Sequence, residues 1–166
     1  MPFVMGVIFC IPLLLWGCVR TVNSLHFEQE IGGYLEQAAA ANNVTLAEEQ
    51  LGKAMEAIKA QKLETGSTAI FDPLATPGED VEFWSTNLSV ALYELKSIPA
   101  GANRLERATA LLKLRETLMD DAQTEPRVPP GISRYPHNGT WALLGLASGL
   151  LFLIGLAFLA LAWDDA

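Results

Sequence analysis

Two long stretches of this sequence, residues 3–19 and 140–163, contain no charged residue. As an α-helix rising 1.5 Å per residue, the second stretch would reach about 36 Å, enough to cross a hydrocarbon core of about 30 Å. The first stretch lies near the lower length limit for a span, roughly 17 residues. Hydrophobic residues make up 51% of the chain, and these two stretches account for much of that high fraction. We therefore predict transmembrane helices at 1–19 and 140–163, the second followed by a short acidic tail at 164–166.

Tryptophan marks the expected ends of both spans. Trp141 and Trp163 stand at the two ends of the second stretch, and Trp16 stands near the end of the first. Indole rings prefer the headgroup level, so we predict that all three are membrane-interface anchors. No Lys or Arg precedes the first stretch, whereas a signal peptide begins with a basic segment. We expect an uncleaved anchor, with a cleaved signal peptide as the alternative.

Small residues occur in both stretches at the spacing of helix packing motifs. Gly145 and Gly149 form a GxxxG motif with Ser148 beside it, and Gly6 and Cys10 form a second pair of small residues four apart. Small residues allow two helix backbones to approach closely in lipid, so these five predict a helix-packing interface. The alternative is that glycine is simply common in spanning helices. Neither stretch contains an ionisable residue of the kind that pumps and transporters keep inside the bilayer.

The segment between the two stretches is polar and acidic. Residues 20–139 contain all 11 Lys and Arg and all but two of the 19 Asp and Glu. Without a basic tract, this segment is not expected to bind nucleic acid. The basic residues nearest the spans, Arg20, Arg127 and Arg134, all lie on the side of this segment. By the positive-inside rule, we expect a cytoplasmic domain in a bacterial inner membrane, with both termini on the opposite side.

Helical periodicity divides residues 20–122 into four amphipathic segments. The apolar positions of the first run from Val22 to Ala41, with Gly32-Gly33 as a weak point, and those of the second from Leu46 to Leu63. Thr45 and Glu48 fit a capping box at the start of the second helix, and Gly66 is a candidate for its C-terminal stop. A third helix is expected from Glu79 to the residue before Pro99, and a fourth from Asn103, with Glu106 three residues later.

Short connections within each pair of helices predict two antiparallel hairpins that form an extramembrane four-helix domain. Residues 65–78 contain two prolines and two glycines and are expected to form a loop. Residues 123–139 contain four prolines and form a Pro-rich linker that leads back to the second span. The predicted fold class is therefore all-α: two transmembrane helices flanking an acidic four-helix domain.

Candidate residues for chemistry are few. His26 and His137 each lie just outside a span, where an imidazole can ligate a haem or chlorophyll-type metal. No binding motif accompanies them, so surface histidine is the preferred interpretation and no cofactor or metal is predicted. The sequence also has no phosphate-binding glycine loop, nucleophile elbow or zinc signature. We expect a protein without enzymatic activity or a small-molecule substrate.

Two functions fit this architecture. The first is an accessory or structural subunit that docks through its two spans onto other integral membrane proteins and clamps their cytoplasmic face with its helical domain. By analogy, a photosynthetic or respiratory complex is an example of such a host. The second is a membrane-tethered binding or regulatory module whose helical domain recruits a soluble partner.

Overall fold

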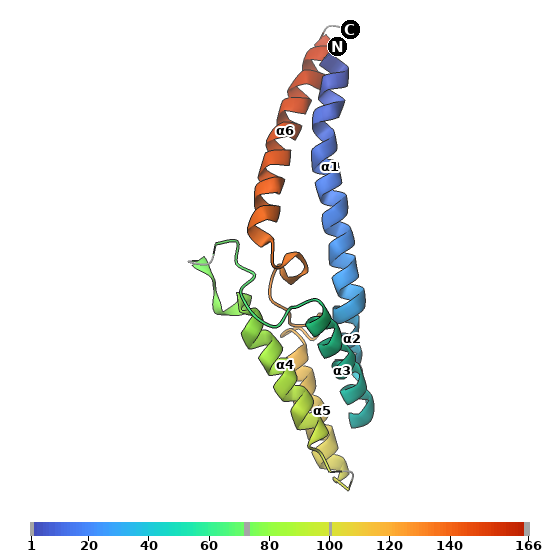
Figure 1. Ribbon diagram of the computed structural model, residues 1–166. Coiled ribbons are helices and arrows are strands. Elements are labelled where there is room, and N and C mark those ends of the chain that lie inside the picture. Colours follow the sequence, from blue (N-terminus) through green and yellow to red (C-terminus); the bar gives the residue numbers. More distant parts are fainter. Residues whose placement is uncertain (1, 72–73, 100, 165–166) are drawn as a thin grey trace.

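The computed structural model describes residues 2–71, 74–99 and 101–164, and within these residues the chain is helical, with no strand (Figure 1). The all-α prediction is therefore confirmed for the described residues. The elements are α1 (Pro2–Phe27), a π-helical turn η1 (Glu28–Gly32), α2 (Gly33–Ala40), α3 (Val44–Ala60), the 3-10 turn η3 (Pro77–Glu79), α4 (Val81–Lys96), α5 (Arg104–Leu118), the 3-10 turn η4 (Ile132–Arg134) and α6 (Asn138–Asp164).

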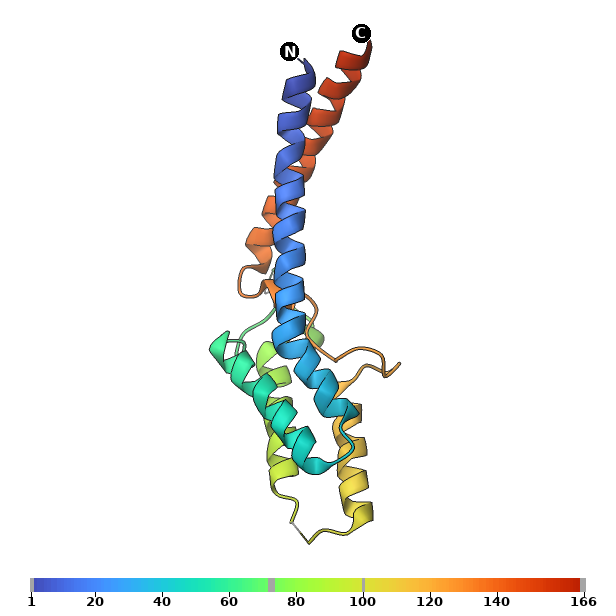
Figure 2. The same ribbon diagram turned by 90° about the vertical axis from the view of Figure 1, so that its right-hand side faces the viewer.

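The molecule is elongated and has two parts. At one end α1 and α6 lie side by side, and at the other end α2, α3, α4 and α5 pack together as a helical bundle (Figures 1 and 2). The first turn of α1 and the last turn of α6 lie at the same end of the molecule, away from the bundle. The name "the bundle" is used below for α2 to α5.

Helix α1 does not stop at residue 19, the predicted end of the first span. It continues through η1 into α2, so that Phe3–Ala40 is one helix of 38 residues. Beyond the uncharged stretch its composition changes from wholly apolar to amphipathic. The buried residues Phe27, Ile31, Leu35 and Ala38 recur every three or four positions and face the core. The predicted weak point at Gly32-Gly33 falls at the π-turn, where the Gly33 N–H donates to the Glu28 carbonyl.

The start and end of α3 differ from the prediction. Asn43, not Thr45, is the N-cap, because its side-chain oxygen accepts from the Leu46 N–H at 2.8 Å. The helix ends at Ala60, before Gly66. Lys62 takes the left-handed conformation, with φ of 57°, and the Leu63 N–H donates to the Ile58 carbonyl at 2.9 Å. This Schellman-type ending satisfies the last carbonyls without a glycine.

The second hairpin begins and ends close to the predicted positions. Asp80 caps α4 by accepting from the Phe83 N–H at 2.9 Å, while η3 occupies the predicted first turn at Glu79. The predicted capping box of α5 is present, since Asn103 and Glu106 accept from each other's backbone N–H groups. Helix α3 packs on α4, and α2 packs on α5. The largest fully buried side chains of the core come from η1 and from all four of these helices: Ile31, Leu35, Leu51, Ile58, Val81 and Leu118.

The Pro-rich segment returns the chain to α6 along the bundle. The Arg127 N–H donates to the Leu118 carbonyl at 2.7 Å, and the Trp84 indole N–H donates to the Arg127 carbonyl at 3.0 Å. Further along, the Tyr135 hydroxyl donates to the Thr65 carbonyl at 2.6 Å. The second apolar helix starts at Asn138, two residues before the predicted start of the span. Both long helices are apolar enough, and long enough, to cross a membrane.

Candidate helix-packing site

Helices α1 and α6 pack along one seam. On α6 the less exposed positions include Trp141, Gly145, Ser148 and Gly155, which are separated by four, three and seven residues. This is the heptad spacing of helices that cross at a small angle. On α1 the same spacing relates Gly6, Leu13 and Trp16. The seam is therefore lined with small residues and a few large rings, and most other apolar side chains of both helices point outward.

The two backbones approach each other closely at Gly6 and Gly155. A Cβ placed on Gly155 would lie 2.8 Å from the Gly6 carbonyl oxygen and 3.2 Å from the Cys10 Sγ. A Cβ placed on Gly6 would lie 2.6 Å from the Leu159 Cγ and 3.0 Å from the Gly155 carbonyl oxygen. At each glycine the shortest of these distances is below 3.0 Å. A side chain larger than a hydrogen atom could therefore be added only if the neighbouring atoms shifted. Beside this crossing the rings of Phe9 and Phe158 stack, with centroids 5.9 Å apart.

A tryptophan pair closes the seam near the bundle. The Trp16 indole N–H donates to the Trp141 carbonyl at 3.1 Å, and the Arg20 guanidinium lies over the Trp16 ring, 5.4 Å from its centroid. Gly145 provides the room for this ring, because a Cβ there would lie 2.9 Å from Trp16 Cζ2. At the opposite end, Trp163 is exposed and makes no such contact among the described residues.

The structure separates the predicted packing residues into two groups. Gly6, Cys10, Gly145 and Ser148 lie on the seam, and the buried Ser148 hydroxyl donates to the Gly145 carbonyl at 3.0 Å. Gly149 lies off the seam, since no atom of α1 comes within 4 Å of its Cβ position. The two glycines of the GxxxG motif thus do not share one contact with α1. The residue paired with Gly6 is Gly155, which the sequence analysis did not single out; its heptad register with Gly145 and Ser148 is the signal that identifies it.

The start of α6 is tied to the bundle through Asn138. This side chain is buried, and its amide nitrogen donates to the Thr68 carbonyl and, at 3.3 Å, to the Gly131 carbonyl. Gly131 has a φ of 79°, a conformation that favours glycine, and its Cβ position is only 2.8 Å from Arg134 Nη2. The junction therefore joins the start of α6 to the Pro-rich segment just before it and to the loop that follows α3, 70 residues away. Nothing in the local sequence pattern marks Asn138 for this role.

Comparison with protein-family models, curated proteins and solved structures finds no match for this chain. Its function must therefore be inferred from its own geometry and chemistry.

The two histidines occupy different surroundings. His26 Nε2 lies 3.0 Å from Glu30 Oε1, one helical turn further on, and both side chains are largely exposed. His137 is the last residue before α6, and it is exposed. Within residues 2–71, 74–99 and 101–164, no group of three or more His, Cys, Asp and Glu side chains is arranged to hold a metal ion. The two cysteines, Cys10 and Cys18, are both free thiols on α1.

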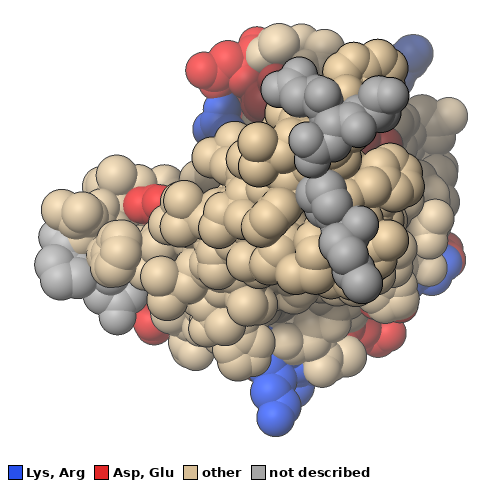
Figure 3. All heavy atoms as spheres, turned by 90° about the horizontal axis from the view of Figure 1, so that it is seen from above, with Lys and Arg blue, Asp and Glu red and all other residues tan. Residues whose placement is uncertain are grey.

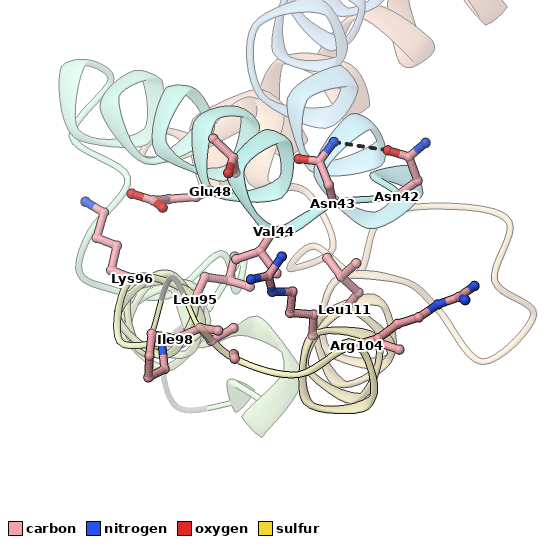
Figure 4. A pocket seen from close by; sticks show the side chains of 14 residues that line it. Asn42, Asn43, Val44, Glu48, Leu95, Lys96, Ile98, Arg104 and Leu111 are labelled. Carbon is pink, nitrogen blue, oxygen red and sulfur yellow. Dashed lines mark hydrogen bonds between the residues drawn. The ribbon is translucent and has the colours of Figure 1, made fainter.

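A hollow lies at the tip of the bundle farthest from α1 and α6 (Figure 4). Its volume is about 810 Å³, and it opens between the tips of the two hairpins. The start of α3, the end of α4 and the start of α5 line it, and the lining includes the apolar residues Val44, Leu95 and Leu111. The charged residues of its lining are Glu48, Lys96, Arg104 and Arg107. This mixed surface differs from the uncharged seam at the other end of the molecule.

Proposed function

We propose that this chain is an integral membrane protein in which α1 and α6 both cross the bilayer. The exposure of their apolar side chains carries the proposal. Only 6% of the most apolar window of the first long helix is buried, and only 11% of that of the second. A core helix of a soluble protein would be mostly covered, and scattered exposed leucines would not form a surface continuous around a helix pair. Lipid supplies the missing apolar environment.

The order of charges along the molecule supports an orientation with the bundle in the cytoplasm, which we assign to a bacterial inner membrane. Arg20 and Arg134 flank the bundle ends of α1 and α6, while the opposite ends carry Trp163 and the acidic tail. The first helix continues into the core through Ile31 and Leu35, which supports its retention as an anchor.

The orientation is tested with a thiol at Tyr93, an exposed position of α4, in a chain whose Cys10 and Cys18 are replaced by alanine. A membrane-impermeant maleimide is expected to modify the Tyr93→Cys variant only after the inner membrane is opened, because the bundle faces the cytoplasm. Modification in intact spheroplasts would contradict this orientation. A soluble cytoplasmic protein and a periplasmic protein with free thiols serve as the two controls.

We further propose that the chain is a non-catalytic accessory subunit that binds other integral membrane proteins. Support comes from the surfaces that the α1–α6 seam leaves uncovered. Gly149 leaves open space on α6 between the exposed side chains of Leu146, Leu150 and Leu153, so the backbone of a neighbouring helix can approach there. The bundle adds exposed apolar side chains on both helices of its second hairpin, among them Phe83, Tyr93, Leu105 and Leu112.

The alternative is a membrane-tethered module that recruits a soluble partner. The hollow at the tip of the bundle favours it, because a cavity of about 810 Å³, lined by both apolar and charged side chains, faces away from the proposed membrane. In this function the helix pair would serve only as the anchor.

Purification from native membranes distinguishes the two functions. An accessory subunit is expected to migrate in mild detergent with a particle several times larger than its own 18.0 kDa, together with other membrane proteins. The Gly149→Leu variant should lose these partners, since the added side chain fills the open space. The matched Leu143→Ala variant should keep them, because Leu143 is an exposed residue of α6 that does not adjoin Gly149. Migration as a monomer or small homo-oligomer, with a soluble protein as the recovered partner, would support the alternative.

A further inference from the structure

The loop between α3 and α4 carries three exposed apolar side chains close to the start of α6. Ile70, Phe71 and Leu74 are 47%, 65% and 76% exposed, and they are called the loop patch below. The base of the loop is closed by hydrogen bonds across it: the Thr68 N–H donates to the Glu79 carbonyl and the Val81 N–H to the Gly66 carbonyl, both at 2.9 Å. The Leu74 N–H donates to the Phe71 carbonyl at 2.9 Å, which brings two members of the patch together.

The loop is docked on the first turn of α6. The buried Asn138 amide donates to the Thr68 carbonyl, and the Cβ position of Gly139 is 3.2 Å from the Ile70 carbonyl oxygen. Asn138 and Gly139 are the first two residues of the apolar helix. The patch is therefore held at the level where α6 begins. Figure 1 shows the loop projecting sideways from the molecule at this height.

Two other features place the headgroup region at the same level. The first is the contact between Trp16 and Trp141, since indole rings gather at this depth. The second is a pair of arginines from distant parts of the chain, Arg20 and Arg134. Partial burial lowers the pKa of the Arg134 guanidinium, and the nearby charge of Arg20 lowers it further. The salt bridges between described side chains include neither arginine, as expected for cations that face lipid phosphates.

A view along the helix pair, from the end where the two termini lie, shows the side of the loop that would face the membrane. In Figure 3 the loop forms a lobe beside the helix pair, and most of its described atoms are uncharged. Apolar side chains held at the headgroup level, next to a helix that enters the hydrocarbon, are in the position of an interfacial anchor. If the loop patch bound a protein partner instead, it would have no reason to lie at the same level as the tryptophan contact and the two arginines.

We propose that Ile70, Phe71 and Leu74 insert into the headgroup and upper acyl region of the same bilayer that α1 and α6 cross. The proposal rests on the membrane crossing proposed above. Together with the two helices, the loop gives the chain a third, laterally displaced contact with the membrane. The bundle is then restrained against rotation about the helix pair, because the loop lies to one side of it.

Depth-dependent quenching tests the proposal in phosphatidylcholine vesicles. Single cysteines replace Phe71, Tyr93 or Leu150 in the chain lacking Cys10 and Cys18, and each is labelled with an environment-sensitive nitrobenzoxadiazole probe. The three positions are comparably exposed, at 65%, 74% and 64%, so any difference reflects their surroundings. Lipids carrying a nitroxide near the headgroup or deep in the acyl chain serve as the two quenchers.

At Phe71→Cys we expect strong loss of emission with the shallow quencher and weaker loss with the deep one. At Leu150→Cys, in the middle of α6, the order should be reversed, and at Tyr93→Cys neither lipid should quench. Quenching at Leu150→Cys without quenching at Phe71→Cys would overturn the loop proposal and leave the membrane crossing intact. Absence of quenching at Leu150→Cys would overturn the crossing and, with it, the loop proposal. A probe at Phe71→Cys that is blue-shifted but unquenched would show burial against protein, which also overturns the proposal.

Discussion

Replacing Gly155 by leucine is expected to force α1 and α6 apart and destabilise the helix pair by about 1–3 kcal/mol, the usual cost of overpacking. The added Cβ alone would lie 2.8 Å from the Gly6 carbonyl oxygen, and a backbone atom cannot swing aside as a side chain can. In a chain of this size each kcal/mol corresponds to a fall in Tm of roughly 2–4 °C. Thermal unfolding in detergent micelles, followed by circular dichroism, measures the change.

The matched control is Gly149→Leu on the same helix. Its Cβ position has no atom within 4 Å, so the expected change in the free energy of unfolding is within about 0.5 kcal/mol for the isolated chain. Both variants add the same apolar side chain and should insert equally well. Equal stability of the two variants would show that α1 and α6 do not cross at Gly155.

A second substitution at the same crossing should produce a covalent bond. In the Gly155→Cys variant the new side chain begins 3.2 Å from the Cys10 Sγ, close to the reach of a disulfide. The Cβ meets the same Gly6 carbonyl oxygen as in the leucine variant, so the backbone must shift here too, but the cysteine side chain adds only one further heavy atom. Copper phenanthroline, as the oxidant, removes one hydrogen from each thiol as the sulfur–sulfur bond forms. Nearly complete intrachain cross-linking is the expected result.

Intact-mass measurement shows the loss of two hydrogens, and migration as a monomer shows that the bond is within one chain. Gly149→Cys is the control for position, because that site faces away from Cys10. Addition of Cys10→Ala to the Gly155→Cys variant controls for Cys18. A disulfide-linked dimer as the main product would place Gly155 on a surface between chains and contradict the intramolecular seam.

The sequence pattern predicted elements better than contacts. The long uncharged stretches and the Asn103 and Glu106 capping box rest on local chemistry, and the structure has the corresponding helices. The start of α3 was misplaced because Asn43 and Thr45 are both good caps only two residues apart, and the choice depends on which side-chain oxygen reaches a free N–H. The end of α3 was misplaced because a lysine takes the left-handed position that glycine usually occupies.

Contacts between distant segments depend on information that a local pattern lacks. Gly145 and Gly149 look equivalent as a GxxxG motif, yet the rotation of α6 about its axis turns only Gly145 toward Trp16. That rotation is set where α6 joins the bundle, through the hydrogen bonds of Asn138 to carbonyls seven and seventy residues away. The close approach of Gly6 and Gly155 depends on the same rotation. It also depends on how α1 and α6 cross, and the chain connects these two helices only by way of the bundle.

The uninterrupted helix from Phe3 to Ala40 makes the protein a rigid lever. Thirty-eight residues at 1.5 Å each form a rod of roughly 57 Å, and a tilt of about 20°, typical of spanning helices, would displace its far end sideways by roughly 20 Å. In the membrane orientation proposed above, a small change of this angle would therefore become a large displacement of the bundle tip. The π-turn at Glu28–Gly32 is the place along this rod where the hydrogen-bond register changes. Its Ile31 is buried in the core, so the rod and the bundle would move as one body.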